Sequence, residues 1–115
     1  MPLLKLQTSV IVTADKKDRL LLALSKTLAG TTGKPESYVM VTLEQGSFCM
    51  AGKVVPAAFA DVRGIGGLNG NVNAQISKEV CDLLKKELGI EPGNIYLNFT
   101  DVPAQNWGFN GRTFG

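Results

Sequence analysis

The pattern of hydrophobic and polar positions divides the first half of the chain into strand, helix and strand. Aliphatic and β-branched residues in LLKLQTSVIV (3–12) predict a strand. Residues 15–32 predict an amphipathic helix, because apolar side chains recur at helical spacing: Leu21, Leu24 and Leu28, with Leu20 and Thr27 beside them. Gly30 and Gly33 favour the end of this helix, and YVMVTL (38–43) predicts a second strand.

The second half of the chain repeats this order. AAFADVR (57–63) predicts a strand, and the glycine-rich GIGGLNGN (64–71) leads from it into a second amphipathic helix. The apolar side of that helix consists of Val72, Ile76, Val80, Leu83, Leu84 and Leu88. IYLNFT (95–100) predicts the last strand.

Two strand–helix–strand units in tandem predict an α/β (α+β) fold. Each unit is expected to be right-handed, so both helices lie on one face of a shared four-stranded mixed sheet. Strands such as YVMVTL are apolar on both sides, which is typical of a sheet covered on both faces. Because the chain offers no third helix, we predict that another copy covers the second face in a symmetric homo-oligomer. The aromatic, glycine-rich tail QNWGFNGRTFG (105–115) is expected to pack against this body or to line a site.

Length and composition narrow the class of protein. A chain of 115 residues is expected to form one domain, residues 1–115. The 12 Lys and Arg residues and 10 Asp and Glu residues are scattered without a basic run, so we expect no nucleic-acid partner. No apolar run approaches the about 18 residues of a membrane span, and no signal-peptide pattern is present. We therefore expect no membrane contact and a cytoplasmic location.

Histidine is absent, which removes the commonest general base and the commonest metal ligand. Chemistry based on Ser-His or Cys-His pairs or on zinc hydrolysis is thereby excluded, and any proton transfer must use an unusual base. Cys49 and Cys81 lack the spacing of a redox pair or a metal site, so both are interpreted as buried apolar thiols.

Four features are candidates for a functional site, and each also has a purely structural interpretation. GIGGLNGN precedes a helix, where free N–H groups favour an anion, but it also serves as a flexible helix start. Lys34 follows a helix, where a cation complements the helix dipole. Tyr96 and Asn98 project from the same side of a strand, which is usually a solvated face. Pro2 is tolerated at a strand start because no ladder hydrogen bond is lost there.

Taken together and in order, these pieces resemble the macrophage migration inhibitory factor group of the tautomerase superfamily over the entire chain. The matching pieces are MP at the start, TGKP followed by Tyr38, Ile65 in GIGG, NVNAQISK, IYLNF and NWGFNGRTF. The resemblance implies a trimer of two-βαβ subunits. It also implies a keto-enol tautomerase, an isomerase acting on phenylpyruvate- or dopachrome-type substrates.

The resemblance implies a role for each matched residue. Met1 is removed, and Pro2 becomes the general base, because an α-amino group that normally titrates near about 8 can stay neutral between apolar walls and beside Lys34. Lys34 and the Ile65 N–H hold the substrate carboxylate, and Asn98 donates to the substrate oxygen. Tyr96 borders the pocket from the adjacent subunit, while other aromatic side chains stack on the substrate ring: Tyr38, Trp107, Phe109 and Phe114. No metal or cofactor is required.

Departures from the family pattern argue against two activities of the vertebrate cytokines, thiol-disulfide exchange and receptor mimicry. The chain reads PAAFA where the vertebrate cytokines carry a C-x-x-C pair, and Val12 and Gln45 replace their Arg and Asp. Trp107 stands where those proteins have a small aliphatic residue, which predicts a narrower pocket. The alternative is a cytokine-like signalling or partner-binding protein that retains a vestigial pocket and leaves the cell without a signal peptide. A dehalogenase or decarboxylase is disfavoured, because no extra Arg or Glu stands at the matched positions.

Overall fold

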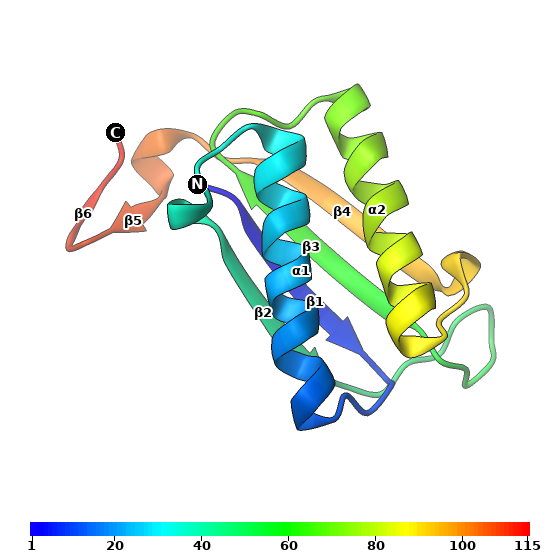
Figure 1. Cartoon of the computed structure of the whole chain (residues 1–115). Helices are drawn as coiled ribbons and strands as arrows, with labels where there is room; N and C mark the ends of the chain where they lie inside the picture. Colours follow the sequence, from blue (N-terminus) through cyan, green and yellow to red (C-terminus); the bar gives the residue numbers. More distant parts are fainter.

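The computed structural model describes residues 1–115 and contains one four-stranded sheet with two long helices on the same face (Figure 1). The main elements are β1 (Leu3–Thr8), α1 (Ala14–Thr32), β2 (Met40–Gln45), β3 (Ala58–Gly64), α2 (Gly70–Leu88) and β4 (Ile95–Asp101). Short 3-10 turns, η1 (Glu36–Tyr38), η2 (Pro92–Asn94) and η3 (Ala104–Asn106), precede β2, β4 and a small hairpin, β5 (Gly108–Phe109) and β6 (Arg112–Thr113).

The sheet confirms the arrangement of two βαβ units. Its strand order is β2-β1-β3-β4, with β1 parallel to β2 and β3 parallel to β4. The two units meet where β1 and β3 pair antiparallel, so the sheet is mixed as expected. The two edge strands, β2 and β4, therefore come from different halves of the chain and form opposite edges of the sheet.

The core lies between the helices and one face of the sheet. The seam of α1 is Leu20, Leu24 and Leu28, whereas Leu21 is only half-buried, so the buried face is turned slightly from the one predicted. In α2 the fully buried positions are Ile76, Val80 and Leu84. Each fully buried aliphatic side chain contributes about 1.5–3 kcal/mol, so this seam accounts for much of the folding free energy.

Two predicted boundaries were wrong, and local hydrogen bonds explain both. β1 ends at Thr8 instead of residue 12, because the Thr8 hydroxyl donates to the Ala57 carbonyl (2.9 Å) and accepts from the Val10 N–H (3.1 Å). These bonds turn the chain out of the sheet. The second strand begins at Met40 instead of residue 38, because Tyr38 belongs to the turn η1.

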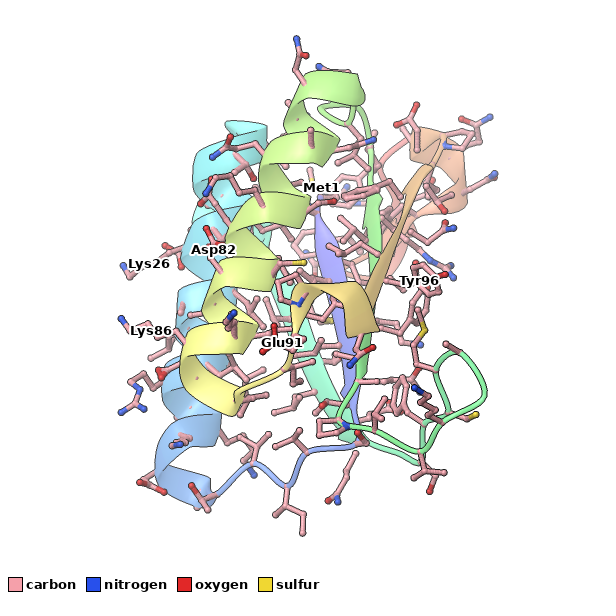
Figure 2. The ribbon with its side chains drawn as sticks, turned by 90° about the vertical axis from the view of Figure 1, so that its right-hand side faces the viewer. Met1, Lys26, Asp82, Lys86, Glu91 and Tyr96 are labelled. Carbon is pink, nitrogen blue, oxygen red and sulfur yellow. The ribbon has the colours of Figure 1, made fainter.

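The sheet face away from the helices is less apolar than predicted. Side chains on this face include Lys5 and Gln7 of β1, Asp61 of β3, and Tyr96 and Asn98 of β4, all of which are at least partly exposed. Figure 2 shows Tyr96 on the side of the sheet opposite Lys26, Asp82 and Lys86, which project from the helical layer. The alternation of buried and exposed positions in β1 and β3 is that of strands covered on one face within this chain.

The interpretation of both cysteines as buried was wrong. Cys49 is exposed in the loop between β2 and β3, and Cys81 is half-buried on α2. Burial raises the pKa of the Cys81 thiol, with a smaller contribution from the charge of Asp82. Neither α1 nor α2 is long and apolar enough to cross a membrane.

Candidate active site

A cavity of about 390 Å³ surrounds the first residues of the chain. Its walls come from the N-terminus, from the segment that leads into β2, and from the C-terminal tail. Figure 1 shows the tail beside the N-terminus, although the two segments lie at opposite ends of the sequence. The cavity brings together five of the nine predicted site residues: Pro2, Tyr38, Trp107, Phe109 and Phe114.

Strand pairing places Pro2 next to the segment that carries Tyr38. Leu3 pairs with Met40 in the parallel β1–β2 register, and the Met40 N–H donates to the Pro2 carbonyl at 3.1 Å. Pro2 itself is buried, and it precedes β1, where its missing N–H costs no ladder bond. The same pairing brings Ser37, Val39 and Met40, which the sequence analysis did not select, into the cavity wall.

The tail folds back as a hairpin that supplies the aromatic wall. Asn110 and Gly111 both have positive φ (53° and 81°), which a tight two-residue hairpin turn requires. Phe109 and Phe114 then stack with their ring centroids 5.2 Å apart and their planes 11° from parallel. Tyr38 meets both rings edge-on, at 5.5 and 6.1 Å. The Asn-Gly pair in the tail is the sequence signal that predicts this hairpin, and it was missed.

Trp107 lies between this cavity and a smaller one of about 280 Å³. Leu3, Trp107 and Gly108 line both cavities, and the smaller one also contacts Arg63, Val102 and Asn106. Arg63 forms an ion pair with Asp61 at 3.0 Å. Trp107 therefore contributes to the walls of both cavities, while the narrower pocket expected from its size stays a prediction.

The electrostatics of the cavity disfavour a charged N-terminus. Burial lowers the pKa of the Met1 ammonium, and the positive charge of Lys34 lowers it further. The Lys34 backbone N–H donates to the Thr32 hydroxyl at 3.3 Å, just after Gly33 ends α1 in the left-handed conformation (φ 71°). While Met1 is present the Pro2 nitrogen is an amide. Removal of Met1 would make Pro2 the amine at this end of the chain.

Lys34 and Ile65 are brought together outside the walls of the aromatic cavity. The Lys34 Nζ lies 3.9 Å from the position that a Cβ would take on Gly66 or Gly67, in the turn that contains Ile65. The Ile65 N–H donates no hydrogen bond within the chain, and the neighbouring Gly66 N–H donates to Asp101 Oδ1 at 2.8 Å. The turn thus combines a cation with an unpaired amide, two groups that suit a carboxylate.

Tyr96 and Asn98 lie away from the Pro2 cavity of the same chain. Both are on β4, which β1 and β3 separate from β2. They are two residues apart on the strand and so share the sheet face away from the helices, where Figure 2 shows Tyr96. Tyr96 is 65% exposed. Neither residue lines the Pro2 cavity of its own chain. The interpretation that Tyr96 acts from an adjacent subunit stays a prediction.

The largest cavity, about 720 Å³, lies at the opposite end of the sheet along the loop between β2 and β3. It is lined by ten residues: Ser9, Val10, Gln45, Gly46, Ser47, Phe48, Cys49, Val54, Val55 and Pro56. None of them carries an ionised acid or base, and no predicted site residue is among them. The aromatic cavity is therefore the better candidate for an active site, although it is the smaller of the two.

Comparison with known proteins gives a consistent result. The chain matches the family model for macrophage migration inhibitory factor (MIF) over residues 1–115. The macrophage migration inhibitory factor of Xenopus laevis is 35% identical over 115 residues, which cover 99% of both chains. That of Meriones unguiculatus is 36% identical over the same length and coverage.

Two solved structures are similar over nearly the whole chain. The macrophage migration inhibitory factor-like protein of Entamoeba histolytica has a TM-score of 0.95 at 36% identity, covering 98% of each chain. The macrophage migration inhibitory factor homologue of Prochlorococcus marinus has a TM-score of 0.93 at 41% identity, covering 98% of this chain and 99% of its own.

Proposed function

Because the chain belongs to the macrophage migration inhibitory factor family of the tautomerase superfamily, we propose that it is an isomerase that interconverts the keto and enol forms of aromatic 2-keto acids. Phenylpyruvate- and dopachrome-type compounds are the substrates implied. The observation that supports this most is the position of the chain's first residues. These residues lie in an aromatic cavity, where burial and the charge of Lys34 lower the pKa of the Met1 amine.

Pro2 is the base in this proposal. Removal of Met1 leaves a secondary amine whose lone pair has a direction set by the ring. An α-amino group titrates near about 8, and burial and Lys34 lower the pKa of the Met1 amine at this end of the chain. The same surroundings should favour the neutral form of the Pro2 amine, which a general base requires. Pro2 takes a proton from the carbon next to the ketone, and the electrons left behind form the enol double bond as charge moves to the ketone oxygen. The protonated Pro2 amine then returns the proton to that oxygen, which regenerates the neutral base.

Other residues bind the substrate and stabilise the charge that develops. Lys34 and the unpaired Ile65 N–H receive the carboxylate, as two donors beside each other can. Asn98 donates a hydrogen bond to the ketone oxygen as it becomes an enolate. The aromatic wall contacts the substrate ring through Tyr38, Trp107, Phe109 and Phe114. The proton shuttle needs no metal or cofactor.

We further propose that residues 1–115 act as one domain and assemble as a homotrimer. The position of Tyr96 and Asn98 on the edge of the sheet farthest from β2 supports this proposal. A neighbouring copy could present these two residues to the Pro2 cavity, and the site would then contain residues from two chains. The same assembly would cover part of the sheet face that lies away from the helices.

The test is the replacement of the base. Pro2→Gly leaves a primary amine whose lone pair is no longer directed by the ring, so kcat for phenylpyruvate tautomerisation is expected to fall by about 100-fold, the order of the contribution of a well-placed general base. An extra residue ahead of Pro2 should have the same effect, because the nitrogen then stays an amide. Pro92→Ala, at an exposed 3-10 turn beyond α2, is the matched control and should retain activity.

Intact mass must show that Met1 is absent from the active protein. Unchanged activity in a folded Pro2→Gly variant, or in protein that retains Met1, would overturn the proposal. Thermal unfolding of each variant separates a lost base from a lost fold.

A further inference from the structure

The turn that contains Ile65 is attached to the end of β4 at two points. The Gly66 N–H donates to the side-chain Oδ1 of Asp101 at 2.8 Å. The Val102 N–H donates to the Gly64 carbonyl, also at 2.8 Å. Gly64 and Asp101 are themselves partners in the parallel β3–β4 register. The end of β4 thus contacts the turn through the Asp101 side chain and through a backbone hydrogen bond from Val102.

The turn needs such an attachment because its backbone is intrinsically mobile. Gly66 and Gly67 both lie in the left-handed region, with φ of 66° and 78°, and glycine samples many other conformations at little cost. Gly67 also makes room for Lys34, since a Cβ there would lie 3.0 Å from the Lys34 Cε. The turn, the lysine and the aspartate therefore form one packed unit.

The two adjacent amides of the turn are used differently. Asp101 occupies the Gly66 N–H, whereas the Ile65 N–H has no acceptor within the chain. A ligand carboxylate would be repelled at Gly66, where a carboxylate already sits, and attracted to the free amide beside Lys34. The Asp101 side chain thus both orients the turn and selects which amide remains available.

We propose that Asp101 is a positioning residue that holds the Ile65 N–H and Lys34 in place for the carboxylate of the substrate. This inference rests on the proposed tautomerase function, and it concerns substrate binding instead of proton transfer. Without Asp101, the substrate would have to order two glycines on binding, and that conformational entropy would be lost from its affinity.

Kinetics provide the first test. Asp101→Ala is expected to raise KM for phenylpyruvate about tenfold, the effect of one lost charge-assisted hydrogen bond, while kcat changes less than about threefold. Asp101→Asn retains an acceptor oxygen and should have a smaller effect. Phenylpyruvate methyl ester has no carboxylate, so its KM should not change. Thr100→Ala, one residue away on β4 and exposed, is the matched control.

A purely structural role would give a different result. If Asp101 only stabilised the fold, the acid and the ester would be affected alike, and thermal unfolding would change in proportion. An unchanged KM for phenylpyruvate in a folded Asp101→Ala variant would overturn the inference, while the proposal for Pro2 would stand.

A second measurement does not depend on turnover. Hydrogen exchange of the Gly66 amide should become at least about tenfold faster in Asp101→Ala than in the unaltered protein. NMR titration with phenylacetate, an unreactive carboxylate, should shift the Ile65 amide signal and bind about tenfold more weakly to the variant. If the unaltered protein has no tautomerase activity, the proposed function fails, and this titration alone decides the role of Asp101. Equal phenylacetate affinity in both proteins would refute it.

Discussion

Pro2 combines two chemical states in one residue, because its nitrogen is an amide behind Met1 and a secondary amine once Met1 is removed. Strand pairing buries it beside Tyr38, and the tail encloses it with aromatic side chains. The residue's proposed reactivity therefore comes from a position in the chain that is also structurally favourable for proline.

Lys34 should set the pH range in which this amine acts. Its charge lowers the pKa of the Met1 amine, after the larger effect of burial, and should act in the same direction on the Pro2 amine once Met1 is removed. The neutral base is lost when the pH falls through that lowered pKa, so kcat/KM should fall on the acid side. In Lys34→Gln the positive charge is absent, the amine pKa rises, and the acid limb of the kcat/KM profile should move to higher pH.

The measurement is the pH dependence of kcat/KM with phenylpyruvate for both proteins. Lys53→Gln, in the loop between β2 and β3, removes a cation far from the N-terminus and serves as the control. An acid limb at the same pH in Lys34→Gln as in the parent would contradict this account, even if the variant binds substrate more weakly.

Among the elements, α1 links the core to the site through the way it ends. Leu20, Leu24 and Leu28 anchor the helix, and the residue after its last turn, Gly33, adopts φ 71° and donates its N–H to the Ala29 carbonyl. This left-handed cap turns the chain so that Lys34 reaches the turn at Gly66. The helix end thereby positions a site residue as well as closing the helix.

Two glycine variants, one inside α1 and one at its C-cap, should change stability in opposite directions. Gly33→Ala forces a Cβ into the left-handed region and should lower the free energy of unfolding by about 1 kcal/mol. Gly30→Ala lies inside the helix with nothing within 4 Å of the added Cβ, and it should raise the free energy of unfolding by up to about 1 kcal/mol. Urea denaturation measures both. Equal shifts would show that the cap conformation carries no penalty.

For the whole molecule, the central question is how the Pro2 cavity and β4 relate across subunits. Pro2 precedes the central strand β1, and its cavity lies towards β2, whereas Asn98 lies on the edge strand β4. If sites are shared, a chain that lacks Pro2 and a chain that lacks Asn98 can complement each other. If each site is complete within a chain, they cannot.

Mixed assemblies of Pro2→Gly and Asn98→Ala chains provide the test. Each variant alone should have low activity. After joint unfolding and refolding at equal amounts, about a quarter of the sites in random trimers should contain an intact Pro2 beside an intact Asn98. Activity should rise accordingly, with the trimer mass confirmed by light scattering. Recovery of no activity in mixed trimers would contradict the shared site.

The fold was largely predictable because its signals are local and repeated. Helical spacing of leucines predicted α1, and the order of elements in each half predicted two βαβ units, both of which the sheet topology confirms. The errors came from side-chain chemistry that no periodicity contains. Thr8 ends β1 through its hydroxyl, and Cys49 is exposed because its loop turns away from the core.

Patterns along the chain predicted the candidate site only in its residue types, and the family resemblance supplied the grouping of Pro2, Tyr38 and the tail around one substrate. The sequence by itself determined which groups were available: a proline behind Met1, a lysine after a helix, a glycine-rich turn, an aromatic tail and no histidine. Only the tertiary structure decided that Pro2, Tyr38 and the tail share one cavity, and that Asp101 leaves the Ile65 N–H free. The physical reason is that periodicity reports contacts within a few residues, whereas these contacts depend on the register of β1 on β2 and of β3 on β4.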